Sequence, residues 1–193
     1  CVLGSGVVQA GQAFDVTGTS EHVGVVSTLH RASKELMCAP YLPGKRLLYG
    51  VTSCGGGSLE WFSRFSAKPV EELLSAAKDA ESEVLFLPYL EGERSPLWDP
   101  HASGTLLGLR STHTEGHVVR AILEGVAFSL RQILEAVERL LPDHPETVIV
   151  SGGASRAQLW NQIKADILAT NMATLKSPHA GILGAAMLAA VAA

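Results

Sequence analysis

The sequence predicts an α/β domain in which helices pack against a mixed β-sheet. Three β-prone runs come early in the chain, and the last third alternates strand and helix patterns. Hydrophobic residues make up 47% of the 193 residues, which is enough to fill a sizeable core. We expect one domain over residues 1–193, because no internal repeat, low-complexity tract or linker divides the chain.

The first third of the chain predicts three strands. Two β-prone runs, Ala13–Thr17 and Val23–Thr28, flank a polar turn that contains a glycine, which is a hairpin signal. Leu47–Thr52 is the third candidate strand, and the prolines and glycine within 40–44 predict a loop before it.

The middle of the chain predicts two helices, a strand and a long loop. The glycines of Cys54–Ser58 open a helix that runs to Phe65, and Pro69–Ala80 is a second helix with proline near its first turn. Glu83–Leu90 is apolar and β-prone. Residues 91–114 are rich in glycine, proline and charge, and we expect a long ordered loop there.

The remaining sequence predicts a long helix followed by alternating elements. Glu115–Leu141 repeats apolar residues at the helical period, and Pro142 is expected to close this helix. After it we expect a strand, a helix, a strand and a helix, at Thr147–Val150, at Gln158–Ala169, at Ala173–Leu175 and from about Ala180.

Charge and apolar segments argue against several classes of protein. The formal net charge is −4, and neither sign forms a long run, so we expect neither a nucleic-acid nor a membrane surface. The apolar run Ile182–Ala193 is shorter than the ~20 residues of a membrane span, and we expect a buried helix. The scattered Cys1, Cys38 and Cys54 match no zinc or disulfide pattern. We expect them to serve as small hydrophobic residues in a reducing cytoplasm.

Three glycine-rich turns are the best candidates for a binding site. Thr17–Ser20 joins two strands, and its N–H and hydroxyl groups can donate to phosphate oxygens. Gly55–Ser58 leads into a helix, whose free N–H groups attract anions. Ser151–Ser155 follows a buried strand and precedes a helix, where open α/β sheets bind ligands. Each turn also has a structural interpretation: a hairpin turn, a flexible turn with Ser58 as N-cap, or close helix–strand packing.

Several other functional motifs are absent. The third turn is not GxGxxG and carries no Gly-Lys-Ser/Thr, which argues against dinucleotide-binding and P-loop sites. His113 and His117 are four residues apart, but no HExxH is present, and we expect a helix-start or solvent role rather than a metal site. The GxSxG motif of serine hydrolases is also missing.

The loop after residue 90 carries carboxylates that can act as general bases. Its charged residues include Glu91, Glu93, Arg94 and Asp99. Composition does not select a base among them, and we expect ion pairs that order the loop.

The three turns occur in an order that resembles the FGGY family of carbohydrate kinases, which are actin-like ATPases with the ribonuclease H-like fold. The resemblance covers nearly the whole chain in the family's order. The stretches that carry it are 3–14, 17–20 (TGTS), 55–62 (GGGSLEWF), 88–100 (PYLEGERSP and WDP), 104–109, 123–128 (LEGVAF), 151–155 (SGGAS) with Trp160, Gln162 and Asp166, and 180–186 (AGILGAA). The stretch 88–100 looks like the loop of the xylulokinases within the family.

The resemblance implies how a nucleotide would lie on this chain. The residues that it assigns to the nucleotide are Gly18, Thr19, Gly56, Gly152, Gly153 and Ala154. The first two would meet the β- or γ-phosphate of ATP, Gly56 would face the ribose and phosphates, and the last three would cover the adenine and ribose. Ala157 stands where some relatives carry an asparagine that contacts the base, so this contact is not expected.

The resemblance assigns no catalytic residue and no metal ligand to this chain. In the family, the catalytic aspartate lies upstream of the matching point, and Asp15 and Asp99 do not match it. The first phosphate motif, the groups linked to magnesium and most sugar contacts belong to a part that this chain lacks. Because the chain starts without a methionine or a signal peptide, we expect a piece of a longer protein, namely the C-terminal nucleotide-binding domain.

The implied function of the intact protein is ATP- and magnesium-dependent phosphorylation of a ketose or polyol similar to xylulose. The partners would be ATP or ADP and a sugar, and a homodimer is compatible with the resemblance. This piece is not expected to phosphorylate a sugar by itself. Glu21 departs from the xylulokinase pattern, so other pentuloses, erythritol-like polyols and related ketoses remain open. One alternative is a non-catalytic actin-like module that binds nucleotide or senses sugar. Another is an acetate kinase-like phosphotransferase, which the loop at 88–100 argues against.

Overall fold

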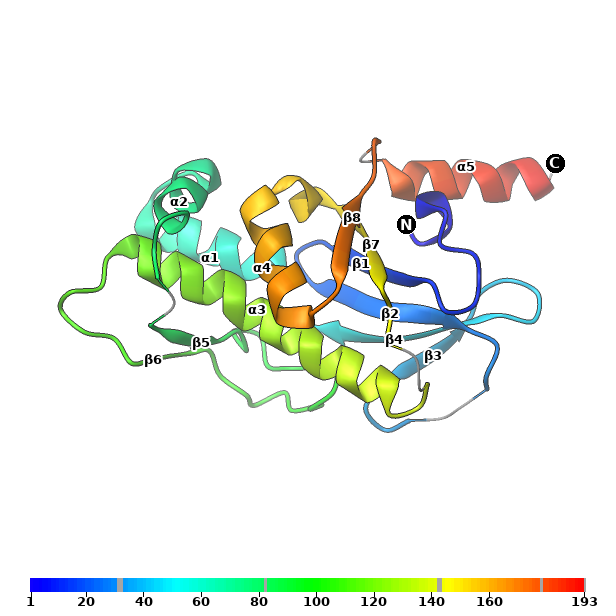
Figure 1. Cartoon of the computed structure of the whole chain (residues 1–193), viewed down its shortest axis with the longest axis horizontal. Helices are drawn as coiled ribbons and strands as arrows, with labels where there is room; N and C mark the ends of the chain where they lie inside the picture. Colours follow the sequence, from blue (N-terminus) through cyan, green and yellow to red (C-terminus); the bar gives the residue numbers. More distant parts are fainter. Residues whose placement is uncertain (31–32, 82, 142–143, 178, 193) are drawn as a thin grey trace.

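The structure is a computed structural model that describes residues 1–30, 33–81, 83–141, 144–177 and 179–192. Its largest feature is a six-stranded mixed sheet with the order β3-β4-β2-β1-β7-β8 (Figure 1). The strands are β1 (Ala13–Thr17), β2 (Glu21–Ser27), β3 (Met37–Pro40), β4 (Arg46–Thr52), β7 (Thr147–Gly152) and β8 (Asn171–Thr174). The prediction of a mixed sheet is confirmed.

The sheet changes from antiparallel to parallel at β1. This strand pairs antiparallel with β2, from Ala13 opposite Val25 to Thr17 opposite Glu21. On its other side it pairs parallel with β7, where Thr17 lies opposite Gly152. The carboxyl ends of β1 and β7 therefore lie side by side, which is the place where open α/β sheets bind ligands.

The edge strand β3 differs from the prediction, which placed a loop at 40–44. Pro40 is the last residue of β3 and lies opposite Arg46 of β4. Proline donates no hydrogen bond to a strand ladder, and an edge strand tolerates this because one of its sides has no partner strand. The loop between the two strands is confined to residues 41–45.

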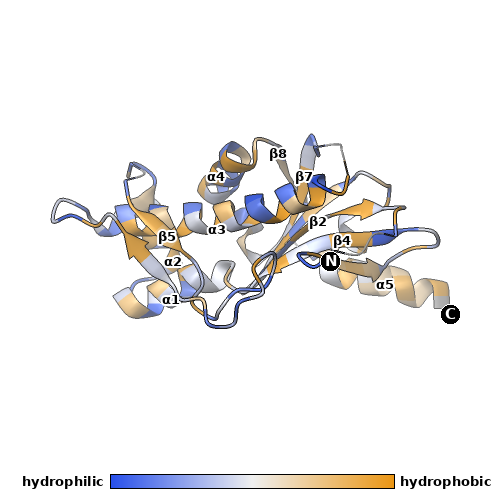
Figure 2. Cartoon of the chain, turned by 90° about the horizontal axis from the view of Figure 1, so that it is seen from below, coloured by the Kyte–Doolittle hydropathy of each residue, from blue (hydrophilic) through white to orange (hydrophobic). Residues whose placement is uncertain are grey.

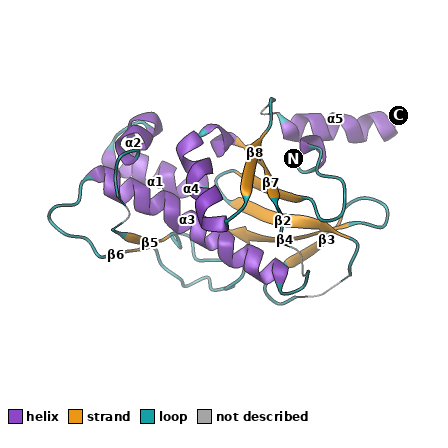
Figure 3. Cartoon of the chain, viewed as in Figure 1, coloured by secondary structure: helices purple, strands orange, loops and turns teal. Residues whose placement is uncertain are grey.

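The helices fall on both faces of the sheet. They are α1 (Gly56–Ser66), α2 (Val70–Ala77), α3 (Glu115–Glu138), α4 (Gln158–Leu168) and α5 (Ala180–Ala192), with 3-10 turns η1 (Leu3–Ser5) and η2 (Gly153–Arg156). The predicted helices are thus confirmed with shifted ends, and Pro142, expected to close α3, lies outside the described residues. Helices α3 and α4 cover one face of the sheet, and α5 lies on the other (Figures 2 and 3).

The core is built around α3. Its apolar residues recur at the helical spacing, and Val119, Ile122, Leu123, Val126, Leu130 and Ile133 are fully buried. The helix runs along the sheet and continues past it to α1, α2 and a small hairpin (Figure 1). The indole Nε1 of Trp160 donates to the carbonyl of Leu123 at 3.1 Å, which joins α4 to the buried side of α3.

The small hairpin also modifies the prediction of a continuous loop over 91–114. Strand β6 (Thr105–Leu107) lies within that segment and pairs antiparallel with β5 (Leu85–Leu87). Both strands are only three residues long, which is why periodicity did not reveal β6.

Helix α5 is present, but the prediction that it is buried is wrong. Its exposed apolar side chains include Ile182, Leu183, Met187, Leu188 and Val191, the last 88% exposed. Figure 2 shows apolar residues along its length. The helix packs closely against η1 through Gly184. A Cβ on this glycine would lie only 3.0 Å from the backbone nitrogen of Gly4. No helix in the described ranges combines the length and the apolar character that a membrane span requires.

We predict that Leu130→Ala destabilises the fold and that Leu188→Ala does not. Leu130 is fully buried, whereas Leu188 is 61% exposed on α5. Removal of a buried leucine leaves a cavity and lowers the free energy of unfolding by about 2–5 kcal/mol. The matched exposed substitution should stay within about 0.5 kcal/mol of the wild type. Urea unfolding followed by circular dichroism measures both, and equal effects would contradict the assignment of α3 to the core.

Candidate functional site

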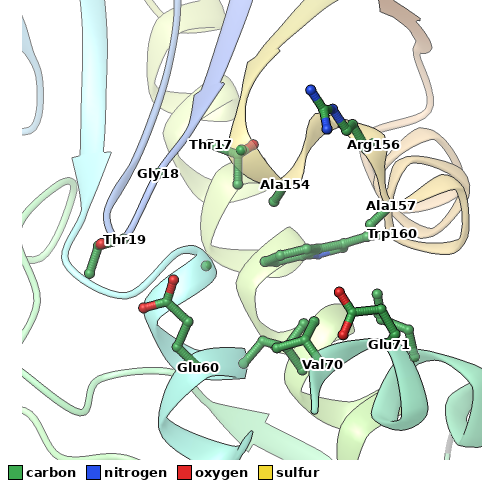
Figure 4. A pocket seen from close by; sticks show the side chains of 14 residues that line it. Thr17, Gly18, Thr19, Glu60, Val70, Glu71, Ala154, Arg156, Ala157 and Trp160 are labelled. Carbon is green, nitrogen blue, oxygen red and sulfur yellow. The ribbon is translucent and has the colours of Figure 1, made fainter. Parts of the chain in front are cut away.

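A pocket of about 520 Å³ opens at the carboxyl ends of β1 and β7 (Figure 4). Its walls are the β1–β2 turn, the first turn of α1, helix α2, and η2 with the start of α4. The volume is within the ~300–1,000 Å³ that ligand pockets occupy. Of the residues predicted to contact a nucleotide, those that line the pocket are Gly18, Thr19, Gly56, Gly153 and Ala154.

The β1–β2 turn presents polar groups to the pocket. The N–H of Gly18 donates to the carbonyl of Ser20 at 2.9 Å, which closes the turn. Thr17 is buried at the end of β1, whereas Gly18 and Thr19 are exposed. Within the described part of the chain, neither the N–H nor the hydroxyl of Thr19 has a hydrogen-bond partner. Both groups can therefore donate to a ligand.

The N-terminus of α1 differs from the prediction of a free anion-binding end. The N–H groups of the glycines at 55–57 donate to the carbonyls of Gly18 and Thr19, at 2.9, 2.8 and 3.0 Å. These groups are not available to an anion. They fix α1 against the β1–β2 turn, so the second glycine-rich turn supports the first.

The structural interpretation of this turn, with Ser58 as N-cap, is also wrong. Gly55 is the N-cap, and the hydroxyl of Ser58 donates to the carbonyl of Cys54 at 3.3 Å. A Cβ on Gly56 would lie 2.8 Å from the carbonyl oxygen of Gly18. The glycine is thus needed for close approach of the two turns, and it lines the pocket.

The third turn brings the ends of β1 and β7 into contact. Gly152 has φ +98°, and a Cβ there would collide with the carbonyl oxygen of Thr17. Gly152 does not line the pocket itself. Gly153 has no atom within 4 Å of the position of a Cβ, and with Ala154 it forms the pocket wall in η2.

An apolar surface occupies the middle of the pocket. In Figure 4 the indole of Trp160 lies between Ala154 and the side chains from α1 and α2. Leu59, Val70 and Leu74 add to this surface. Trp160 is only 1% exposed, so it backs this surface, and the partly exposed Val70, Leu74 and Ala154 are the apolar side chains that a planar ligand can reach.

Sequence reasoning missed part of this lining. Arg156 is the cation that lines the described pocket, and Glu60 and Glu71 are its carboxylates. Helix α2 carried an amphipathic pattern but no motif, so only the tertiary fold brings its first turn to the pocket. Ala157 lines the pocket next to Trp160, at the position where the sequence predicted the loss of a base contact.

A buried cluster of charges lies behind the β1–β2 turn. The ammonium of Lys164 donates to Asp15 Oδ2 at 2.8 Å, to Thr17 Oγ1 at 2.9 Å and to Glu21 Oε1. Lys164 is 1% exposed, and the other three residues are fully buried. Burial alone would lower the pKa of Lys164, but the two carboxylates outweigh it and the pKa is raised. The sequence pointed to Glu21, but it gave no signal for Lys164.

The pKa of the Glu21 carboxyl group is shifted upward by its surroundings. Burial, together with the charge of Asp15, raises its pKa from 4.5 to about 8, against the opposing effect of Lys164. Thr17 Oγ1 lies 2.6 Å from Glu21 Oε1. Among the described residues, no hydrogen-bond partner faces Oε2 of Glu21.

The two histidines differ in how they fit the predicted helix-start or solvent role. His117 is at the N3 position of α3, and its Nδ1 accepts from the N–H of the N-cap Thr114 at 3.1 Å. His113 precedes the helix and pairs with Glu83 at 2.9 Å. The helix-start role is therefore confirmed for His117.

The charged residues of the loop are ordered by hydrogen bonds rather than by the predicted ion pairs. The buried carboxylate of Glu93 accepts from the Thr52 hydroxyl at 2.8 Å, from the Ser53 N–H at 2.9 Å and from the Arg94 N–H at 2.7 Å. The backbone of Glu93 also bridges to Asp99. These bonds hold the loop against the end of β4.

The three thiols are free, as predicted. The expectation of a small buried hydrophobic residue is confirmed for Cys54, whose thiol pKa is raised by burial. Cys38 is half-buried and accepts from Arg46 Nε at 3.1 Å. Cys1 is exposed and does not fit the expectation.

The donor set of the pocket does not form a metal site of its own. The described residues contain no group of three or more His, Cys, Asp or Glu side chains arranged to hold a metal ion. Glu60 and Glu71 are the pocket carboxylates. Magnesium commonly binds through one or two carboxylates together with substrate phosphates, and only this mode fits these residues.

The chain is similar to carbohydrate kinases over nearly its whole length. Residues 14–193 match the FGGY family of carbohydrate kinases, C-terminal domain. Xylulose kinase from Bacillus subtilis is 33% identical over 97% of this chain and 39% of the relative. Glycerol kinase from Geobacter is 31% identical over 100% of this chain and 41% of the relative. The chain thus spans about two fifths of the length of these relatives.

Solved structures of carbohydrate kinases have a similar fold. A xylulose kinase from Brucella ovis has a TM-score of 0.90 and 28% identity, and the match covers 100% of this chain and 42% of that chain. A Plasmodium falciparum glycerol kinase with ADP shares the fold, with a TM-score of 0.86 and 23% identity over 97% of this chain and 39% of that chain. The predicted fold of the actin-like ATPase type is confirmed.

We predict that Gly152→Ala destabilises the chain more than Gly153→Ala. An alanine at φ +98° is strained and meets the Thr17 carbonyl, whereas a methyl group at 153 enters open space. The first substitution should lower the free energy of unfolding by at least about 1–3 kcal/mol, and the second by a few tenths. Urea unfolding of the two variants side by side tests this, and equal losses would contradict it.

We predict that Glu21 makes stability fall as pH rises. Its folded-state pKa of about 8 exceeds the usual 4.5, so the unfolded chain binds fewer protons between these values and unfolding becomes easier as pH rises. The stabilising contribution is complete below pH 4.5 and is lost toward pH 8. The measurement is the free energy of unfolding in urea, from pH 5 to 8, for the wild type and for Glu21→Gln. The value for the wild type should fall relative to that of the variant as the pH rises, because glutamine does not titrate. A constant difference would show that Glu21 does not titrate in this range.

Proposed function

Because the chain belongs to the FGGY family of carbohydrate kinases, we propose that it forms the ATP-binding half of an enzyme that phosphorylates a hydroxyl group of a ketose or polyol.

The observation that carries the proposal is the convergence of the three glycine-rich turns on one pocket. The first turn contributes Gly18 and Thr19 to the lining of the pocket, and the second contributes Gly56. The third contributes Gly153 and Ala154. The pocket combines donors at the β1–β2 turn with an apolar surface around Trp160. A nucleotide has the same two parts, since its phosphates accept hydrogen bonds and its base is flat and aromatic.

In the proposed complex the phosphates lie at Gly18 and Thr19, and Gly56 lies against the ribose and phosphates. Gly153 and Ala154 cover the adenine and ribose, with Gly152 as their support. The N–H and the hydroxyl of Thr19 have no partner among the described residues, so they supply hydrogen bonds to phosphate oxygens. Ala157 offers no hydrogen bond to the base.

Magnesium would arrive with the nucleotide phosphates in this proposal. When bound, it neutralises charge that develops during phosphoryl transfer. Glu60 and Glu71 are the carboxylates of the pocket that could approach it. The contribution of this chain is to hold the nucleotide in one orientation, which is most of what catalysis of phosphoryl transfer requires.

The sugar-binding site and the general base that deprotonates the sugar hydroxyl would belong to a part of the protein outside these 193 residues. The chain corresponds to about two fifths of its relatives, and we propose that a catalytic aspartate and most sugar contacts lie in the other part. The relatives include kinases named for xylulose and for glycerol. A xylulose-like ketose or polyol is therefore the proposed substrate class, and the isolated chain is proposed to be inactive.

The test measures ADP release by the longer protein that contains this chain, with ATP, magnesium and a panel of xylulose, ribulose, erythritol, glycerol and gluconate. We expect release that depends on one class of sugar. The 193-residue chain alone should release no ADP with any sugar, while calorimetry should detect weak ADP binding. A longer protein that binds ADP but uses no sugar would favour the non-catalytic module.

We predict that Thr19→Val weakens ADP binding by about tenfold or more, because a hydrogen bond to a charged group contributes about 1.5–3 kcal/mol. The matched control is Thr105→Val, since Thr105 lies in β6 away from the pocket. Calorimetric titration with ADP compares both variants with the wild type. An unchanged affinity for Thr19→Val would remove Thr19 from the proposed phosphate site.

A further inference from the structure

The buried charges around Lys164 lie outside the pocket wall but next to it. Thr17 belongs to both, because it lines the pocket and accepts a hydrogen bond from Lys164. A lysine that is 1% exposed is unusual, and nothing in the nucleotide site proposed above uses it.

The cluster joins two walls that are separate in the sequence. Its oxygen atoms come from Asp15 and Thr17 on β1 and from Glu21 on β2, which flank the β1–β2 turn. Its nitrogen comes from α4. On that helix Lys164 follows Trp160 by one turn, and its ammonium lies 4.9 Å from the centre of the indole ring. One ammonium group therefore contacts the residues beside the phosphate-side turn and the ring of the apolar wall.

The physical role of such a cluster is geometric. Burial of an ion pair costs desolvation energy, so its net contribution to stability is small or unfavourable compared with apolar packing. Once formed, however, the buried charges cannot separate without leaving an uncompensated charge. The distance between the β1–β2 turn and α4 is fixed for this reason.

We propose that Lys164 is a positioning residue for nucleotide binding, because it holds the β1–β2 turn and the pocket wall that Trp160 supports at the spacing that lets one nucleotide contact both. This inference rests on the proposed function. It predicts a specific pattern: loss of Lys164 weakens a ligand that spans both walls and spares one that touches only the apolar wall.

The test titrates the 193-residue chain with ADP and, separately, with adenosine. Lys164→Met alone leaves buried carboxylates without a partner, so the main variant is Asp15→Asn, Glu21→Gln and Lys164→Met combined, which removes the charges together. Thr17→Val, which removes one hydroxyl and keeps the shape, is the second variant. Lys78→Met is the control, because Lys78 is exposed.

We expect the combined variant to fold and to bind ADP about tenfold more weakly, with its affinity for adenosine within about twofold of the wild type. Thr17→Val should show the same selectivity with a smaller change, and it decides the matter if the combined variant does not fold. Unchanged ADP affinity, or equal losses for ADP and adenosine, would overturn the role of Lys164. If the wild type bound neither ligand, the proposed function itself would fail.

Discussion

The ammonium group of Lys164 is the point on which the arrangement around the pocket depends. Strand β1, strand β2 and helix α4 each provide one side of its surroundings, and the side chains of the cluster are buried. A shift of any of these elements would separate Lys164 from its oxygen partners and leave a buried charge unpaired, which is costly in a medium of low polarity. The mixed pairing of β1 with both β2 and β7 sets the positions of the carboxylates that this geometry requires.

Glycine contacts extend this constraint to the rest of the site. The N–H groups at 55–57 attach α1 to the β1–β2 turn, and Gly152 lets β7 end against Thr17. At Gly56 and Gly152 a side chain would occupy space that the carbonyl oxygens of Gly18 and Thr17 already fill. The glycine-rich turns are thus first of all devices for close packing, and the polar pocket surface follows from the packing. This explains why their structural and functional interpretations are not in conflict.

Sequence patterns predicted the fold well where a period was long enough to read. The helix predicted over Glu115–Leu141 rested on its helical period, and the strands predicted at Ala13–Thr17 and Thr147–Val150 rested on short β-prone runs; all three are present, with shifted ends for the helix and the second strand. The edge strand at 37–40 and the three-residue strand at 105–107 were too short, and the proline within the first masked it. The candidate site was predicted at its glycines, because turns have a local signature. Lys164 and the lining from α2 have none, because only the tertiary fold gives them their neighbours.

The charges of the pocket indicate how a polyanion would be bound there. Arg156 is the cation of the described lining, and Glu60 and Glu71 oppose a negative ligand. The affinity for phosphates must then come from dipoles of N–H and hydroxyl groups, which act at short range and depend on exact placement. Fixed positive charge tolerates errors of position much better than hydrogen bonds do. A site of this composition therefore relies on a rigid frame, and the buried ion cluster and the glycine contacts provide that frame.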